Sequence, residues 1–249
     1  MPISSFRLHA FLYHLIGSAT LCLAGLWLVF FVWYPSPLHV AAGVTGIFLI
    51  VLGVDVSLGP LMTLVLANPR KKRVLFKLDM AVIITVQLAA FIYGIYTVSV
   101  GRPVWLVLNV DRFDLVRADE IGNLDIDKAL EQFRSASWLG PQYAYVPPPK
   151  DSAENSAQIE EFLSTGMDIF QLPKLYRPFP EGKELITAKA QTLDELRKSN
   201  PPEEVNKILA DNPDADAWLP LKSRVQPVTV LVNKAEGRVV KIVELDPNW

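Results

Sequence analysis

A single carboxylate, Asp55, lies within the run GVDVSLGPLMT (residues 53–63), which is part of a longer segment composed almost entirely of apolar residues. Asp55, Gly59 and Thr63 recur at i, i+4 and i+8, so they share one face of a helix. Pro60 lacks a main-chain N–H and interrupts the helical hydrogen bonding next to Gly59. This spacing predicts a polar, closely packed face on an otherwise apolar helix.

Two other apolar runs carry small or polar residues that match this face. The first run has such a stripe at His14, Gly17, Ser18, Cys22 and Gly25, and the third has one at Gln87, Ala90 and Gly94. Small residues let helices approach closely, and polar residues form hydrogen bonds between them. Three interpretations follow: His14, Gln87 or a Thr pairs with Asp55 inside a bundle; the face receives another protein's membrane helix; or the carboxylate moves ions or protons.

The remaining reactive residue types are distributed unevenly along the chain. Cys22, His9, His14 and His39 all precede residue 101, so residues 101–249 contain neither His nor Cys. Ser-His-Asp and Cys-His catalysis and His/Cys zinc sites are therefore excluded from that part. A Ser-Lys dyad or a carboxylate pair stays formally possible, but no spacing supports either. We expect no catalytic residue, cofactor site or metal site.

Three apolar runs are long enough to cross a membrane, at about residues 11–33, 40–66 and 80–100. The first exceeds the apolar core of a signal peptide and has no small-x-small cleavage site, so it reads as an uncleaved anchor. The chain carries a net charge of +4 up to residue 100 and −6 beyond it. We predict a transmembrane region over residues 1–100 and an acidic, water-soluble domain over 101–249. The acidic balance argues against a nucleic-acid partner.

The loops between these runs indicate an orientation. The sequence NPRKKRVLFKLD between the second and third runs has five basic residues and one acid, whereas YPSPLH between the first two has no Lys or Arg. Basic loops stay on the cytoplasmic side, so the N-terminus is cytoplasmic and residues 101–249 emerge on the far side. In a Gram-negative cell this means the inner membrane and the periplasm. The basic loop also suits contact with anionic lipid headgroups of the bilayer.

The soluble part reads as an α/β domain, a small sheet with short helices. Strands are predicted at 104–110 and 113–118 and on either side of the turn at 234–237, and helices at 125–134, 156–164, 192–199 and 202–211. Residues 140–155, rich in Pro, read as a loop. A possible partner surface consists of aromatic residues, although most of them are expected to pack internally: Tyr143, Tyr145, Phe170, Tyr176, Phe179 and Trp218.

Several blocks together resemble the TfpX/TfpZ family of type IV pilin accessory proteins, which includes FimB-like proteins. The blocks span nearly the whole chain: YP (34–35), GVDVSLGPLMTLV (53–65), NPRKK (68–72), QLAAFIYG (87–94), RPVWLVLNVDRFDLV (102–116), LPKLYRPF (172–179), LPL (219–221) and VELDPNW (243–249). Asn248 departs from the pattern, because the family ends in Asp-Pro-Trp without that insertion.

This resemblance implies a non-enzymatic inner-membrane factor that acts with the pilus assembly machinery as a chaperone for one major type IV pilin. We expect a three-helix groove to hold the pilin's membrane helix and the α/β domain to hold its periplasmic head. Two alternatives remain: a membrane-anchored periplasmic sensor or ligand-binding protein, and an auxiliary subunit of a transport or glycosylation machine. A sensor would need a cytoplasmic output module, and the basic loop is too short to be one.

Overall fold

The computed structural model describes residues 5–248 and divides the chain into two compact units. Residues 1–4 and Trp249, with which the VELDPNW block ends, lie outside the description. The first unit comprises the residues up to Val32 and Val44–Val100, and the second comprises Trp33–Gly43 and the residues from Gly101 onward. Three long apolar helices followed by a mixed sheet with short helices confirm the predicted fold class.

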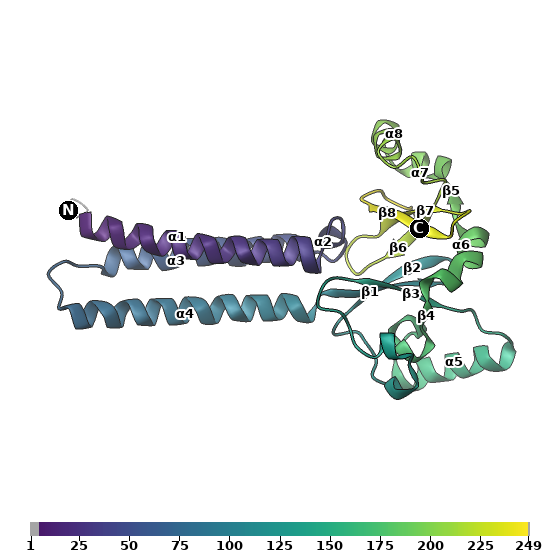
Figure 1. Ribbon diagram of the computed structural model, residues 1–249, viewed down its shortest axis with the longest axis horizontal. Helices are drawn as coiled ribbons and strands as arrows, with labels where there is room; N and C mark the ends of the chain where they lie inside the picture. The colour runs from purple at the N-terminus through teal and green to yellow at the C-terminus, as the bar shows by residue number, and fades with distance from the viewer. Residues whose placement is uncertain (1–4, 249) are drawn as a thin grey trace. The chain divides into compact units, whose positions relative to one another are not determined.

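The first unit consists of three long helices. Helix α1 (Ser5–Trp27) continues through a π-helical segment (Leu28–Trp33), and α3 (Val44–Leu66) and α4 (Arg73–Val100) follow. Each is long and apolar enough to cross a membrane. Helix α3 packs along both α1 and α4, and Figure 1 shows the three side by side. Helix α4 begins seven residues before the predicted span, so the basic residues Arg73 and Lys77 lie in its first two turns.

The strands of the second unit form one mixed sheet in the order β4-β3-β1-β2-β6-β7-β8, and β5 also pairs with β6. Strands β1 and β3 are parallel, as are β2 and β6, and all other neighbours are antiparallel. The bounds are β1 Pro103–Asn109, β2 Arg112–Arg117, β3 Gln142–Val146, β4 Arg177–Pro178, β5 Gln191–Thr192, β6 Ala217–Lys222, β7 Val228–Asn233 and β8 Arg238–Val243. The hairpins β1–β2 and β7–β8 are the two that the sequence predicts.

Alternate side chains of the central strands are buried on opposite faces of this sheet. In β6, Leu219 and Leu221 belong to one core cluster, called the main core cluster below. Trp218 belongs to another cluster on the opposite face, together with Leu196 of α7 (Leu193–Ser199) and Val205 of α8 (Pro202–Ala210). Around β1 and β3, the sheet face opposite the main core cluster is covered by 3₁₀ turns and by the segment that contains Tyr176. A strand covered on both faces has no polar side, so it reads as a continuous apolar run.

The connection between the first two spans contributes to this soluble core. Its short helix α2 (Leu38–Ala41) places Leu38 and Ala41 in the main cluster beside β6 and β7. The Ala41 carbonyl accepts hydrogen bonds from the Ser223 hydroxyl at 3.0 Å and from the main-chain N–H of Val225 at 3.3 Å. The sequence predicts that residues 33–43 belong to the transmembrane region, whereas in the structure their contacts lie within the second unit.

Other local predictions differ from the structure. Residues 125–134 form two 3₁₀ turns (Ile126–Lys128 and Glu131–Phe133) instead of one helix, and the predicted loop at 140–155 contains β3. Helix α5 (Ser152–Thr165) is longer than predicted, because Asp151 caps it by accepting from the Glu154 N–H at 2.8 Å. Helix α6 (Lys183–Lys189) was not predicted. Thr192 precedes α7 but forms no side-chain cap.

We predict that Leu38→Ala destabilises the second unit, although residue 38 lies in the sequence between two membrane spans. Leu38 is 2% exposed, and truncating a buried Leu costs about 2–5 kcal/mol in free energy of unfolding. Hydrogen exchange of the β6 and β7 amides in the full chain should accelerate accordingly. Leu163→Ala on α5, where the side chain is 76% exposed, is the matched control and should change little. Equal exchange in the two variants would show that the connection is dispensable for the core.

Candidate functional site

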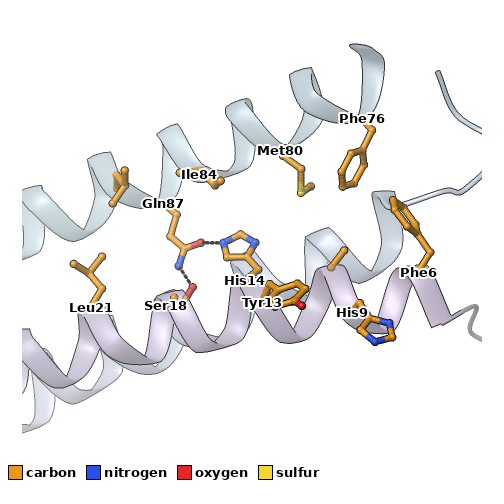
Figure 2. Close-up of a pocket in the computed structure, with 13 residues that line it drawn as sticks. Phe6, His9, Tyr13, His14, Ser18, Leu21, Phe76, Met80, Ile84 and Gln87 are labelled. Atoms are coloured by element: carbon orange, nitrogen blue, oxygen red, sulfur yellow. Dashed lines mark hydrogen bonds between the residues drawn. The ribbon is translucent and has the colours of Figure 1, made fainter. Parts of the chain in front are cut away.

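The three long helices meet through a polar cluster, defined here as His14, Ser18, Thr63 and Gln87. The His14 Nδ1 atom lies 2.6 Å from Thr63 Oγ1, and Nε2 lies 2.8 Å from Gln87 Oε1. The Gln87 amide donates to Ser18 Oγ at 2.8 Å and to the main-chain oxygen of Asp55 at 3.0 Å. Figure 2 shows Gln87 of α4 bonded to His14 and Ser18 of α1. One network therefore links all three helices.

The hydrogen-bonding capacity of these groups restricts the protonation of His14. The Gln87 Oε1 atom can only accept, so His14 Nε2 carries a proton. Thr63 has a single hydroxyl hydrogen, and its oxygen lies 3.1 Å from the Gly59 carbonyl as well as beside His14 Nδ1. If Thr63 donates to His14, the imidazole is neutral; if Thr63 donates to Gly59, Nδ1 must also carry a proton. Both protonation states satisfy the network with the same heavy-atom positions.

Asp55 does not join this network through its carboxylate. Its side chain is buried, with 7% of the residue exposed, and Oδ2 has no hydrogen-bond partner among residues 5–248. The sequence left open a pairing of this carboxylate with His14, Gln87 or a Thr; the structure instead bonds Gln87 to the main chain of Asp55. A buried acceptor without a donor is energetically unfavourable. The carboxylate thus supplies an unused hydrogen-bonding position in the bundle.

Small residues on the predicted faces permit the close helix approach. A Cβ atom added to Gly59 would lie 1.8 Å from Gln87 Oε1, so only glycine leaves room for that amide. Gly94 of α4 also lies at a close contact with α3, because a Cβ atom added there would lie 3.1 Å from Val51 Cγ1. Pro60 is buried beside Gly59 within α3. Polar bonding and glycine packing therefore occur on the same face of α3.

A groove of about 680 Å³ lies between α1 and α4. Its walls are mainly apolar, and His14, Ser18 and Gln87 contribute polar atoms to it. In Figure 2, Met80 and Ile84 of α4 face α1 across this groove. The other lining residues are Phe6, His9, Ala10, Tyr13, Gly17, Leu21, Phe76 and Leu88. Helical spacing identifies His14, Ser18 and Gln87 but not the apolar walls, because a Leu or Ile that faces a groove has the same sequence pattern as one that faces lipid.

The six aromatic residues predicted as a possible partner surface differ in their burial. Tyr176 and Trp218 are wrong for that role, because both are core residues, with 0% and 2% exposure. Tyr176 donates to the Phe170 carbonyl, and Trp218 Nε1 donates to the Thr192 carbonyl at 2.9 Å. Tyr143, Tyr145 and Phe179 pack against the main core cluster, and Phe170 packs against the cluster around Trp105.

The phenol groups among these aromatics are accordingly protonated at neutral pH. Burial raises the pKa of Tyr143 to about 12. The pKa of Tyr176 is raised further by burial and, to a smaller extent, by the charge of Asp114. Burial also raises the pKa of Tyr145, with smaller contributions from Glu184 and Glu181. Neutral, partly covered phenols suit packing and hydrogen bonding, not nucleophilic chemistry.

Gly59→Ala should disrupt the polar cluster, because the new methyl group and the Gln87 amide cannot occupy the same space. Overpacking of this kind costs about 1–3 kcal/mol, so the thermal unfolding temperature of the detergent-solubilised protein should fall. Gly53→Ala on the same helix is the matched control, since nothing lies within 4 Å of the added Cβ. Gln87→Ala removes the clashing amide, so the Gly59→Ala/Gln87→Ala double variant should lose less stability than the sum of the single variants. Strict additivity would contradict the contact.

Comparisons with known proteins add a family to this geometry. The chain is 34% identical to two fimbrial assembly proteins of Dichelobacter nodosus, of serogroups I and E1, over 180 residues that cover 72% of this chain and 70% of each relative. A third, of serogroups C1 and C2, is 38% identical over 108 residues, which cover 43% of this chain and 82% of that protein. No family model and no solved structure matches the chain. Identity at this level over this length shows that the chain belongs to the family of fimbrial assembly proteins.

Proposed function

We propose that this protein is a non-enzymatic inner-membrane accessory factor of the TfpX/TfpZ type that binds a major type IV pilin and stabilises it for pilus assembly. The curated relatives are named for fimbrial assembly, which supports a role in that process. The chain combines three apolar helices with an α/β domain, so it offers one part to a membrane segment and another to a soluble head. Other components of the inner-membrane assembly machinery would bind the complex of this protein with the pilin.

The groove between α1 and α4 is the observation that carries this proposal. A segment that enters a groove between membrane helices must itself satisfy its main-chain hydrogen bonds, which favours a helix. The apolar walls suit a helix with apolar side chains, and Gly17 leaves part of the α1 wall low. Of the polar cluster, His14, Ser18 and Gln87 line the groove and offer hydrogen bonds to a polar residue on that helix. Such bonds between membrane helices contribute about 0.6–2 kcal/mol each.

The second unit would hold the pilin's globular head. The partly exposed aromatics Tyr143, Tyr145, Phe170 and Phe179 remain candidates for this contact, whereas Tyr176 and Trp218 do not. Linking a helix contact to a head contact makes the second binding step intramolecular, so two weak contacts give tight binding. A sensor that signals into the cytoplasm is disfavoured, since α3 and α4 are joined only by residues 67–72.

A topology experiment tests the proposed location. The five basic residues of the second loop and the absence of Lys and Arg from the first predict that residues 101–249 are periplasmic. A periplasm-dependent reporter fused after Gly101 should be active, and the same reporter fused near Lys72 should be silent. The reverse pattern would place the domain in the cytoplasm and remove the head-binding part of the proposal.

Filling the groove tests the proposed pilin contact. Gly17→Leu adds bulk to the α1 wall at a position where nothing lies within 4 Å of the added Cβ, so the bundle itself should stay intact. Recovery of crosslinked pilin with the protein, and the amount of surface pili, should fall by about tenfold if exclusion costs roughly 1.4 kcal/mol. Both are measured by immunoblot in the native host.

Gly53→Leu is the control for this experiment, because Gly53 is an exposed glycine on α3 that does not line the groove. It should leave pilin recovery unchanged. If Gly17→Leu accumulates normally and still retains pilin and pili at the original level, the groove is not the pilin seat. Loss of pili with full pilin recovery would instead place the role of the groove after binding.

A further inference from the structure

A short loop of the second unit, the Trp138 loop (residues 137–140), exposes Trp138 and Leu139. It contacts residues at both points where the chain leaves its long helices toward the soluble domain. The Trp33 indole Nε1 donates to the Trp138 carbonyl at 3.1 Å, and the two ring centroids are 6.3 Å apart. The Arg102 guanidinium lies 3.9 Å from the Trp138 ring centroid, and its Nη2 atom donates to the Ser137 carbonyl at 3.4 Å. Trp33, Arg102 and the loop all belong to one compact unit.

These two attachment points have a known relation to the membrane-spanning segments. Trp33 is the last residue of the span Ser5–Trp33, and Arg102 follows the span Arg73–Val100 by two residues. The headgroup layer on each side of the hydrocarbon core is about 5–8 Å thick. The Trp138 ring, 6.3 Å from the ring that ends the first span, is therefore within about one headgroup-layer thickness of that span end.

The composition of the loop suits this depth. Trp138 is 62% exposed and Leu139 is 87% exposed, although both are large apolar side chains. Indole rings favour the membrane interface because they combine an apolar body with a polar N–H group. Within the loop, the Leu139 N–H donates to the Ser137 hydroxyl at 3.0 Å. In water this exposure is unfavourable, whereas in a bilayer interface it is favourable.

We propose that the Trp138 loop is a membrane-contact site, in which Trp138 and Leu139 insert into the headgroup region of the leaflet from which residues 33 and 101 emerge. The contact is continuous with the ends of the spans and gives the α/β domain an attachment to the bilayer besides its three chain connections to the spans. It orients the domain by lipid contact through a loop that is distant in sequence from both span ends. This inference is independent of the proposed pilin binding.

The test places a fluorophore at position 139 of the full-length protein. Leu139→Cys in a Cys22→Ala background is labelled with an environment-sensitive dye and reconstituted into phosphatidylcholine/phosphatidylglycerol nanodiscs that contain a lipid with a headgroup nitroxide. We expect a blue-shifted emission and loss of most of the fluorescence by nitroxide quenching. Leu163→Cys on α5 is the control, because Leu163 is similarly exposed at 76% but has no contact with the span ends among those described. It should emit as in water and stay unquenched.

A second measurement separates lipid insertion from burial in protein. Alkylation of the unlabelled Leu139→Cys variant by a membrane-impermeant maleimide should be slow in nanodiscs and fast after the lipid is replaced by a small-micelle detergent, whereas the Leu163→Cys variant should react rapidly in both. The same measurements on Trp138→Cys give an independent result, and trypsin resistance of the domain verifies the fold of each variant. Emission and alkylation at position 139 that match position 163 in nanodiscs would overturn the proposal and leave the loop available to a protein partner.

Discussion

The absence of water from the bilayer interior is the constraint on which the helical unit depends. A polar side chain there must find its partners on neighbouring helices, and His14, Ser18, Thr63 and Gln87 do so across α1, α3 and α4. Because Gln87 also needs space, residue 59 must be glycine, and the packing of α4 against α3 follows from that contact. Three members of this cluster, His14, Ser18 and Gln87, also line the groove, so the interactions that hold the bundle together also shape the polar part of that groove.

The two units bury and expose their apolar side chains in different ways. The helical unit exposes apolar side chains to lipid and keeps its hydrogen bonds inside, whereas the α/β unit covers both faces of its sheet with helices and turns. Residues 33–43 connect them by leaving one unit and completing the core of the other. In the proposed pilin-binding role, the helical unit, which faces lipid, binds the membrane helix of the pilin. The α/β unit, which faces water, binds the folded head.

Much of this architecture could be predicted from the sequence, because long apolar runs and hairpins have strong local patterns. The three spans, the β1–β2 and β7–β8 hairpins and the proline start of α8 are examples. Strand β3 was hidden by the prolines around it, and β6 by Pro220 and by pairing with distant strands. At the site, helical spacing placed Asp55, Gly59 and Thr63 on one face, but it could not say that Gln87 bonds the main chain of Asp55. Spacing identifies a face, whereas the choice of atoms depends on the packing of three separate helices.

The hydrogen bond from Ser223 to the Ala41 carbonyl joins residues 182 positions apart. Residues 33–43 therefore leave the ribosome long before β6 and β7 exist, and the apolar side chains of Leu38 and Ala41 have no core to enter during that interval. Contacts of such sequence separation form late, because loop closure costs entropy before it is rewarded. Folding of the sheet domain is thus coupled to completion of the whole chain, and a nascent protein stalled after its third span holds an unfinished piece of its soluble core.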